Sequence, residues 1–378
     1  MMPTFLFIHN IKWRKELTPQ INTQDQPPKT IQQIWGSMAQ NILLLCGGGG
    51  SEHEISLISA KYIAECLAEI KNTQDFPALA ELKVFQVEIG ADGFWRQSKD
   101  QQEVHLNGRY LHINGRNEEI HYAIPCIHGP PGETGDIQSL FELAKLPYFG
   151  SGPEGSRLCF NKISTKLWLE ALHIPVTPYK FISSLADLAT AQAAFDEWKY
   201  LFVKASSQGS SVGIYLVTDR QNLEYTLVEA FRYSPYVLLE KRISGRELEV
   251  AVYEYNGERH ATVPGEIICP SKFYSYEEKY DQDSQTTTKT VAPDLSREVV
   301  QQIQAYALKA FEALKLRHLA RVDFFYTQDG QILLNEINTF PGMTPISMFP
   351  KMLTQNGHQM PQFLAQAINQ GLLPSHKH

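Results

Sequence analysis

Two acidic residues of this chain, Asp323 and Glu336, stand on either side of an Asp-Gly dipeptide, where a hairpin would bring them face to face. Residues 319–326 and 331–337 are rich in β-branched, aromatic and aliphatic side chains, and Asp329-Gly330 between them is a strong signal for a two-residue hairpin loop. With this loop, Asp323 is predicted to lie directly opposite Glu336. Opposed side chains have Cβ atoms about 5 Å apart, and two like charges there destabilise a sheet. We therefore expect a positive charge between them.

The same register places Arg321 opposite Asn338, on the face that carries the two acids, because side chains alternate along a strand. Two carboxylates and an amide oxygen are hard ligands that suit Mg²⁺, which commonly fills its other positions with water and nucleotide phosphates. The hairpin therefore predicts a metal and nucleotide site formed by Asp323, Glu336 and Asn338. The alternative is a solvated sheet face on which a nearby Lys or Arg neutralises each acid.

The segment that follows this hairpin favours the metal and nucleotide site. Residues 339–347 are punctuated by Pro and Gly and rich in small polar residues. Loops of this kind let backbone N–H groups face a ligand, and functional residues concentrate on them. We therefore give the ligand-binding interpretation more weight than the solvated face.

The composition of the whole chain limits the classes of function. The length of 378 residues suggests two or three domains. The net charge is −7 and no basic block occurs, so nucleic acid is not an expected partner. No apolar run approaches the roughly 20 residues that cross a bilayer, so no membrane association is expected. The five cysteines are scattered without CxxC spacing, which argues against a zinc site or a disulfide framework and favours a reducing cytoplasm.

The first 37 residues differ from the rest of the chain. They are rich in Gln, Pro, Thr and Lys, and their apolar run at residues 4–8 is too short for the core of a signal peptide. After Met38, residues 39–46 form a natural first strand. We expect the folded protein to begin near Met38, with residues 1–37 as a flexible extension or the product of a misplaced start codon.

Three regions follow, with boundaries expected at 38–158, 159–241 and 242–378. In the first region strands alternate with helices, which predicts an α/β domain with a mostly parallel, Rossmann-like sheet. Its expected strands are residues 42–46, 82–89 and 122–127, and its expected helices are 52–70 and 137–144. Residues 150–156 then break the pattern, and 160–172 form an amphipathic helix.

The second and third regions have an α+β pattern. The smaller, second region is expected to hold strands at 200–204, 212–217 and 236–240 and a helix at 223–231. The third is expected to hold strands at 247–255 and 261–268, a long loop at 269–293, a helix at 296–314 and the hairpin described above. Loops of that length are uncommon unless they are lids, and the aromatic residues at 273–280 favour a lid over disorder.

A loop of small residues at 204–213 joins two strands of the second region. Its backbone amides can approach phosphate oxygens as anion-binding nests do, although no Walker A motif occurs. Lys204 at the strand end and Lys162 upstream are candidates to supply positive charge to phosphates. The alternative is a flexible surface hairpin with ordinary surface lysines.

The strand that ends near Glu240 leads into a connection of the kind that can offer backbone donors and acceptors to adenine, while a carboxylate such as Glu247 holds ribose hydroxyls. Neutralisation of Glu240 by Lys241 is the alternative. The glycine run at 47–50 follows a strand and opens a helix, but Glu52 stands where a dinucleotide fingerprint needs glycine. Glu52 either compensates the helix dipole or pairs with the ammonium group of a substrate.

Taken together, these residues resemble the D-alanine:D-alanine ligases, members of the ATP-grasp superfamily. The similarity runs from about residue 40 to residue 353. The matching stretches are residues 51–57, 128–129, 150–152, 204–213, 273–280 and 335–347. Six ordered motifs are far more specific than any one of them. The resemblance implies an ATP-grasp fold in which three domains surround a cleft, ATP lies between two of them, and the protein is a homodimer.

The resemblance also implies the site for ATP, the co-substrate. Lys162 and Lys204 contact its phosphates, and Lys279 contacts the transferring phosphoryl group. The loop 206–211 covers the phosphates. Glu240, with the backbone that follows it, reads adenine, and Glu247 takes the ribose. The residues implied for ATP are thus Lys162, Lys204, Ser206, Gly209, Ser211, Glu240, Lys241, Glu247 and Lys279.

The amino-acid and metal sites are implied in the same way. Glu52, supported by Ser210 and Tyr280, anchors the amino group of the first D-alanine, and His128 lies near its carboxylate. Arg321 and the Gly342 amide receive developing oxyanion charge. Ser347 and the backbone of Met348 hold the carboxylate of the second D-alanine. Asp323, Glu336 and Asn338 bind two Mg²⁺ ions, for which Mn²⁺ can substitute.

The implied reaction is the ligation of two D-alanine molecules through an acyl phosphate, with release of ADP and phosphate, for peptidoglycan precursor synthesis. The chain departs from the family pattern at Asn161, where an acidic residue is usual, and at residues 130–135, where Pro-Pro-Gly-Glu-Thr-Gly stands. The alternatives are a ligase that joins D-alanine to D-lactate or D-serine, and a nucleotide-binding regulatory protein without catalysis. Retention of Arg321 and Lys279 counts against the regulatory protein.

Overall fold

The first part of the chain forms the predicted parallel sheet. The computed structural model describes residues 39–70, 75–269 and 286–373, so the expected extension at 1–37 lies outside the described residues. β1 (Gln40–Gly47) pairs in parallel with both β2 (Leu82–Ile89) and β7 (Tyr122–Pro125), and β3 (Trp95–Gln97) adds an antiparallel edge. The sheet order is therefore β3-β2-β1-β7, and the Rossmann-like prediction is confirmed for these strands.

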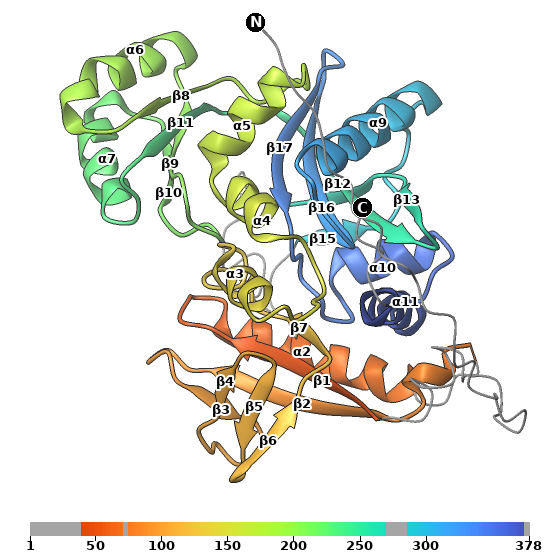
Figure 1. Cartoon of the computed structure of the whole chain (residues 1–378). Helices are drawn as coiled ribbons and strands as arrows, with labels where there is room; N and C mark the ends of the chain where they lie inside the picture. Colours follow the sequence, from red (N-terminus) through yellow and green to blue (C-terminus); the bar gives the residue numbers. More distant parts are fainter. Residues whose placement is uncertain (1–38, 71–74, 270–285, 374–378) are drawn as a thin grey trace, which may run out of the picture.

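The two faces of this sheet are covered differently, because alternate residues of β1 point to opposite sides. Ile42 and Leu44 pack with α2 (His53–Ile70), whereas Leu43 and Leu45 pack with α3 (Asp136–Leu143). A small antiparallel sheet lies on the α3 side (Figure 1) and was not predicted, because its strands have only three or four residues each. Its strands are β4 (His105–Asn107), β5 (Tyr110–Ile113) and β6 (Arg116–Glu119), and a short 3-10 helix (Pro77–Leu79) precedes β2.

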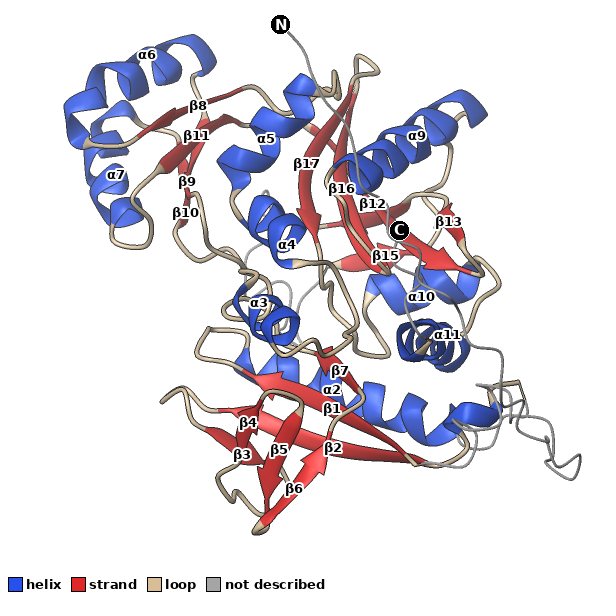
Figure 2. Cartoon of the chain, in the orientation of Figure 1, coloured by secondary structure: helices blue, strands red, loops and turns tan. Residues whose placement is uncertain are grey.

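The second region is an antiparallel sheet with two helices on one side (Figure 2). The strand order is β10-β9-β11-β8, and the helices α6 and α7 pack their apolar faces on it. The bounds are β8 (Tyr179–Ile182), β9 (Leu201–Ala205), β10 (Ile214–Val217), β11 (Val237–Lys241), α6 (Leu188–Trp198) and α7 (Leu223–Phe231), with 3-10 turns at Leu185–Asp187 and Arg220–Asn222. The loop 206–213 joins β9 to β10 as predicted.

Between the first two regions lie α4 (Pro153–Phe160) and α5 (Lys162–Ala171). The predicted break at 150–156 is partly wrong, because α4 already begins at Pro153. Proline is well suited to the first position of a helix, where its missing N–H has no partner to lose. Asn161 is extended between the two helices and caps α5.

The third region is built on a larger sheet in the order β15-β14-β12-β16-β17, with β13 paired to β12. α9 (Arg297–Ala313) covers one face, and α10 (Met348–Gln355) packs against β12. The strands are β12 (Gly245–Tyr255), β13 (Glu258–Ala261), β14 (Gly265–Ile268), β15 (Thr287–Lys289), β16 (Leu319–Thr327) and β17 (Ile332–Asn338). The single strand predicted at 261–268 is wrong: two strands separate at Pro264, which has no N–H to give to a ladder.

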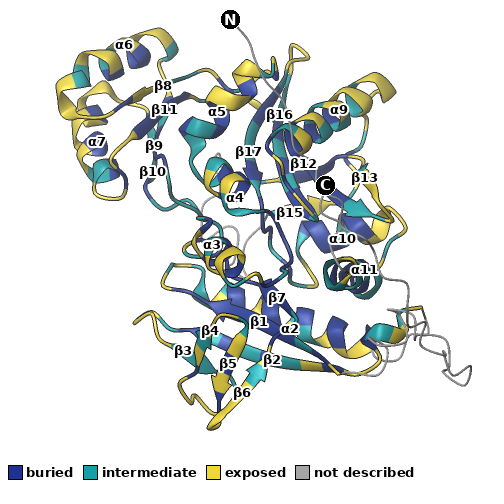
Figure 3. Ribbon diagram, in the orientation of Figure 1, coloured by how far each residue is buried: buried dark blue, intermediate teal, exposed yellow. Residues whose placement is uncertain are grey.

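The C-terminal helix α11 (Met360–Leu372) returns to the first region and packs on α2. Phe363 and Ile368 share a buried cluster with Ile42 and Ile63. Figure 3 shows buried residues on the central strands and the inner helix faces, and exposed residues on the outer helix faces and on the small sheet β4-β5-β6. The first and third regions therefore share a core, and the predicted domain boundaries stay predictions.

Candidate functional site

The hairpin of β16 and β17 brings together the residues from which the metal site was predicted. Asp323 pairs with Glu336 and Arg321 with Asn338, as predicted. The turn is one residue longer than the Asp-Gly signal indicated, because Thr327 N–H donates to Gln331 O and encloses three residues. A register shift follows, with Phe324 opposite Leu334, which leaves Asn335 as an extra residue. This bulge offsets the longer turn, so the pairing of the charged residues is still the predicted one.

Each acid of the hairpin has a positive partner. Arg321 donates from Nε and Nη2 to the two carboxylate oxygens of Asp323, both at 2.8 Å, and Asn338 Nδ2 donates to Asp323 Oδ2 at 3.1 Å. Lys162 Nζ lies 3.8 Å from Glu336 Oε2. Although burial lowers it, the pKa of Arg321 stays well above its ordinary value because of Asp323 and Glu249. The side chains of Arg321 and Asp323 are largely buried, which disfavours the solvated-face alternative.

Glu249 was missed by the sequence reasoning. It lies on β12 directly opposite Asp323, and its Oε1 is 3.2 Å from Arg321 Nε. Glu249, Asp323 and Glu336 therefore occupy one row across three neighbouring strands. The position of Glu249 beside Asp323 could not be predicted, because nothing in the sequence indicates that β12 pairs with β16. Within the described residues, no group of three or more His, Cys, Asp or Glu is arranged to hold a metal, so the predicted site relies on two acids and an amide.

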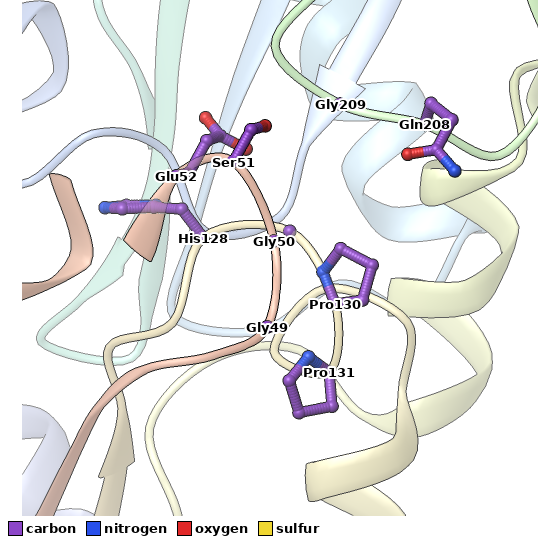
Figure 4. Close-up of a pocket in the computed structure, with 10 residues that line it drawn as sticks. Gly49, Gly50, Ser51, Glu52, His128, Pro130, Pro131, Gln208 and Gly209 are labelled. Atoms are coloured by element: carbon purple, nitrogen blue, oxygen red, sulfur yellow. The ribbon is translucent and has the colours of Figure 1, made fainter. Parts of the chain in front are cut away.

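A pocket of about 410 Å³ opens where the first region meets the loop 206–213 (Figure 4). Glu52, Ser51 and His128 lie on one side of it, and Gln208 lies across from them. Burial lowers the pKa of His128, and the charges of Glu52 and Arg321 act on it in opposite directions, so the charged hairpin is close to this pocket. The lining residues are Gly49, Gly50, Ser51, Glu52, His128, Gly129, Pro130, Pro131, Gln208 and Gly209.

Glu52 immediately precedes α2 and reaches the loop of the second region. A Cβ added at Gly209 would lie 3.2 Å from Glu52 Oε2, which is tighter than most side-chain contacts. Glycine at this position therefore lets the carboxylate approach the loop closely. Ser210 and Ser211 follow with φ of 47° and 62°, in the left-handed region that nests use. The structure thus brings Glu52 close to Gly209, the residue before Ser210, and the predicted support of Glu52 by Ser210 stays a prediction.

His128 is buried and held through both ring nitrogens. Its Nδ1 lies 3.2 Å from Phe340 O and its Nε2 lies 2.8 Å from Ser59 Oγ. Burial lowers the pKa of His128, so the ring is neutral at pH 7, Nδ1–H donates to the carbonyl, and the Ser59 hydroxyl donates to Nε2. Ser59 also accepts from Met343 N–H at 3.4 Å. Ser59, which the sequence reasoning missed, thereby ties α2 to His128 and to the loop after β17.

That loop places Gly342 beside the start of α10. A Cβ at Gly342 would lie 2.9 Å from Ser347 Oγ, so only glycine fits without a shift. Ser347 precedes the helix, its hydroxyl is 2.7 Å from Thr344 Oγ1, and Met348 is the first helical residue. The amides of a helix N-terminus favour a negative group. This is the position predicted for a carboxylate.

Lys162 connects the hairpin with the loop of the second region. Its backbone N–H donates to Ser206 O at 2.8 Å, and its ammonium donates to Gln208 O at 2.7 Å. Ser206 is buried, and its hydroxyl is 2.8 Å from that of Ser234. Ser206 therefore holds the base of the loop, whereas residues 208–211 form its accessible part.

Asn161 serves both α5 and the same loop. Its Oδ1 accepts from Ser164 N–H at 2.9 Å as the helix cap, and its Nδ2 donates to Ser207 Oγ at 3.0 Å. An aspartate, one of the acidic residues expected at this position, would keep the cap and accept from the serine hydroxyl instead. The departure at Asn161 therefore preserves the local geometry.

Replacing Asn161 with Ala is expected to lower the free energy of unfolding by about 1 kcal/mol, the typical worth of an N-cap. It should also raise the KM for ATP several-fold, since the loop loses its link to α5, whereas Asn161→Asp should behave like the unchanged protein. Thermal unfolding and initial rates at varied ATP measure both effects. Ser296→Ala, which removes the cap of α9, is the matched control for stability without a change in KM. Equal KM values for Asn161→Ala and Asn161→Asp would contradict the prediction.

The carboxylate of Glu240 pairs with lysines other than the expected Lys241. It contacts Lys166, Lys204 and Thr177, whereas Lys241 is exposed at the strand end. The proposed neutralisation of Glu240 by Lys241 is therefore wrong, because successive strand residues point to opposite faces. Glu247 lies on β12 two residues before Glu249, on the same face. The roles predicted for adenine and ribose stay predictions.

Glu133, in the segment 130–135 that differs from the family pattern, lies close to the charged Glu52. Its Oε1 accepts from Gly129 N–H at 3.1 Å. Burial of the carboxyl, together with the charge of Glu52, raises the pKa of Glu133 to about 8. The group is therefore mostly protonated at neutral pH, and it can be neutral beside Glu52 without repelling it.

The raised pKa of Glu133 predicts a dependence of stability on pH. Between the unfolded pKa near 4.5 and the folded pKa near 8, the folded chain keeps a proton that the unfolded chain has lost, so stability falls as pH rises. Glu133→Gln should remove this loss. The free energy of unfolding of the unchanged protein should fall by roughly 1 to 3 kcal/mol more than that of the variant between pH 5 and pH 8. Thermal unfolding at both pH values measures it. The exposed Glu258→Gln is the control, and an identical pH slope in Glu133→Gln would refute the assignment.

Two predicted residues, Lys279 and Tyr280, lie outside the described residues together with most of the predicted lid. No helix in the described ranges is long and apolar enough to cross a membrane. Most of the other predicted residues lie in four places: the pocket around Glu52, the charged face of the hairpin, the cluster at Glu240, and the start of α10 with Gly342, Ser347 and Met348.

Two family models match the chain. Residues 41–151 match the D-ala D-ala ligase N-terminus, and residues 168–369 match the D-ala D-ala ligase C-terminus. Together they cover most of the described chain. The gap between them falls at residues 152–167, in α4 and the first part of α5.

Relatives match over nearly the same span. A D-alanine--D-alanine ligase of Tolumonas auensis is 56% identical over 332 residues, which covers 87% of this chain and 97% of the relative. One from Shewanella piezotolerans is 52% identical over 335 residues, covering 87% and 98%. The crystal structure of D-alanyl-alanine synthetase A from Vibrio cholerae superposes with a TM-score of 0.82 at 48% identity, covering 89% of this chain and 99% of that one.

Proposed function

This chain belongs to the D-alanine–D-alanine ligase family, and on that premise we propose that it joins two molecules of D-alanine, with ATP as co-substrate, and releases ADP and phosphate. Its fold is the ATP-grasp fold of the ligase structures that it matches. The observation that carries the proposal is the identity above one half, over most of the chain, with relatives that bear this name. The product, D-alanyl-D-alanine, is a building block of peptidoglycan precursors.

The first step is attack by the carboxylate of one D-alanine on the γ-phosphate of ATP, which breaks the bond to ADP and gives an acyl phosphate. Both reactants are anions, so positive charge is needed around them. Lys162, which lies between the loop and Glu336, and Lys204 supply it. Glu52, which lines the pocket together with His128, pairs with the ammonium group of the same D-alanine. His128 acts near the substrate carboxylate as a neutral ring.

The proposed metal site on the hairpin holds two Mg²⁺ ions, or Mn²⁺ in their place, as the family resemblance implies. Asp323, Glu336 and Asn338 present hard oxygen atoms on one sheet face, and that donor set is the one these ions prefer. When bound, such ions neutralise phosphate charge during phosphoryl transfer. Arg321 balances the charge of Asp323, and Lys162 balances that of Glu336.

In the second step the amine of the other D-alanine attacks the carbonyl carbon of the acyl phosphate, the new C–N bond forms, and phosphate leaves. Negative charge develops on the carbonyl oxygen, and donors placed there are worth about 3 to 4 kcal/mol. Arg321 and the Gly342 N–H are the proposed donors. Ser347 and the first amides of α10, from Met348 onward, hold the carboxylate of the attacking D-alanine.

The nucleotide lies between the second and the third part of the chain, residues 159–241 and 242–378. Residues 208–211 cover its phosphates, with Gly209 and Ser211 as the closest candidates, and Ser206 anchors their base. The backbone near Lys241 recognises adenine, and Glu247 binds the ribose. Lys279 and Tyr280 complete the site from the predicted lid, which excludes water from the acyl phosphate.

The test is phosphate release from ATP and Mg²⁺ with D-alanine or L-alanine as the amino acid. Release with D-alanine alone, with D-alanyl-D-alanine as the product found by mass spectrometry, is the expected result. No release with D-alanine would overturn the proposal. A mixed product with D-lactate or D-serine in preference to D-alanine would favour the alternative ligases, which the named relatives do not support.

The expected homodimer and the cytoplasmic location are further proposals that rest on the family and on the scattered cysteines. Light scattering coupled to gel filtration measures the mass in solution. A mass of one chain across the working concentration range would refute the homodimer. Limited proteolysis likewise tests the proposed boundaries at 158 and 241 and the extension at 1–37.

A further inference from the structure

A lysine that no part of the proposed reaction uses is buried beside the nucleotide region. Lys166 lies on α5 with a side chain only 1% exposed. Its ammonium is 2.6 Å from Glu240 Oε1 and 2.6 Å from Thr177 Oγ1, to which it donates. A buried ammonium is costly unless it is paired and hydrogen-bonded, and here it is both. Burial lowers the pKa of Lys166, whereas the charge and the hydrogen bond of Glu240 oppose that shift, and these two contacts favour the charged lysine.

The partner of Lys166 is shared with a second lysine. Glu240 is 2% exposed, its Oε1 also accepts from the Thr177 hydroxyl at 2.7 Å, and its Oε2 pairs with the ammonium of Lys204. Although burial favours the neutral acid, Lys166 and Lys204 together hold the pKa of Glu240 at about 2. One carboxylate is thus clamped between two ammonium groups.

The two lysines differ in what they can reach. Lys166 is enclosed between α5, Thr177 and Glu240. Lys204 is 12% exposed and lies in β9 next to Ala205, from which the loop 206–213 departs. Of the two, Lys204 is the one that can meet a ligand. Both oxygens of Glu240 are already engaged, so its side chain serves the lysines.

The net charge of the cluster depends on Lys166. A single Lys204 paired with Glu240 would be neutral overall and would offer little attraction to a phosphate. With Lys166 present, the three side chains carry a net charge of one positive unit, and its only outlet toward a ligand is Lys204. When a phosphate draws Lys204 away, Lys166 still satisfies Glu240. The acid is then not left as an uncompensated buried charge, which would be strongly unfavourable.

We propose that Lys166 is a positioning residue for nucleotide phosphates: it holds Glu240 so that Lys204 keeps its positive charge available and can exchange Glu240 for a phosphate oxygen. The inference deepens the proposed function, since it rests on Lys204 as a phosphate contact. Lys166 itself does not touch the nucleotide. Its effect should therefore depend on the phosphates and not on the base.

The experiment compares the binding of ADP and of adenosine to Lys166→Met by titration calorimetry. Adenosine has the same base and ribose but no phosphate. We expect the affinity for ADP to fall by about tenfold or more, a change of at least 1.4 kcal/mol, while the affinity for adenosine stays within about threefold. An equal loss for both ligands would show a merely structural role and overturn the proposal. Unchanged binding of both would overturn it as well.

A second variant keeps the test decisive if Lys166→Met does not fold. Lys166→Met combined with Glu240→Gln removes both members of the buried pair, so Lys204 again carries one net positive charge. The ratio of ADP to adenosine affinity should return to within about threefold of the unchanged protein. A double variant with the low ratio expected of Lys166→Met would overturn the proposal.

Lys83→Met is the control, because Lys83 is an exposed lysine on β2 of the first region and pairs with Glu118, outside the elements that carry the cluster. It should leave the ratio unchanged, which separates a local effect from a general loss of positive charge. The measurement involves binding alone. Its outcome is therefore independent of the phosphate-release assay with D-alanine that tests the proposed function.

Discussion

Glu336→Gln is expected to lower D-alanine-dependent ADP release by about two to three orders of magnitude. The substitution keeps the shape of the side chain but removes one of the two negative charges that face each other across the hairpin. An amide is a much weaker ligand for Mg²⁺ than a carboxylate, and the lost neutralisation of phosphate charge is worth several kcal/mol. Coupled detection of ADP at saturating ATP and D-alanine measures the effect.

The lower rate should recover in part as Mg²⁺ is raised, because the variant binds the ion more weakly. Glu258→Gln on the exposed β13 is the matched control and should retain full activity. Lys162 loses a charged neighbour in Glu336→Gln but keeps its bond to Gln208 O, so thermal unfolding should change little. Full turnover in Glu336→Gln, or a loss that no concentration of Mg²⁺ reverses, would reject the metal assignment.

The pairing on which this prediction depends shows how far local reasoning reaches. The prediction of Asp323 opposite Glu336 from an Asp-Gly loop was correct at the charged residues, yet the turn has three residues and a bulge at Asn335 follows it. Two deviations of one residue each cancel. Side-chain faces have a period of two, so either deviation alone would have turned Glu336 to the other face. Sequence patterns do not show bulges reliably, because they depend on the twist and packing of the sheet.

Residues that are joined by long-range contacts were the ones missed. Ser59, Lys166 and Glu249 have no motif of their own, and each matters through a partner more than 60 residues away. Glu249 becomes relevant only once β12 is known to lie beside β16, and Lys166 only once α5 is known to pack against Glu240. The sequence pattern predicted helix α2 and strands β1 and β2 well, because hydrophobic periodicity is local.

Buried charge explains why the candidate site could be predicted in part. Acids such as Asp323 and Glu240 are tolerated inside a protein only with a positive partner, so a strand carrying an acid implies a nearby lysine or arginine. The identity of that partner does not follow: Lys241 was expected for Glu240, and Lys166 and Lys204 were found. The structure supplies this information because helix α5 comes from a distant part of the chain.

Arg321→Lys is the second substitution with a large expected effect, about a hundred- to a thousandfold loss in the rate of dipeptide formation. The guanidinium uses Nε and Nη2 to hold Asp323, and its fork lets it hold the acid and face the substrate together. A lysine ammonium has one charged atom and cannot do both. The positive charge beside Asp323 and Glu249 is kept, however, so the fold should survive.

The products distinguish this role from a general defect. Attack on ATP by the first D-alanine does not need the oxyanion donor of the second step, so acyl phosphate should still form in Arg321→Lys. With the second step slowed, water has more time to consume this intermediate. Phosphate release should then exceed dipeptide formation, whereas the unchanged protein should give one phosphate per dipeptide. Parallel assays of phosphate and dipeptide in the same reaction measure this ratio.

Arg246→Lys is the matched control, because Arg246 also holds a carboxylate through two bonds, to Glu266 at 2.7 and 2.9 Å, on the same sheet. It should lose a comparable amount of stability while keeping one phosphate per dipeptide. A ratio near one in Arg321→Lys together with a low rate would place Arg321 in the first step or in binding. Because the two steps share one active site, only an excess of phosphate assigns Arg321 to the oxyanion of the second.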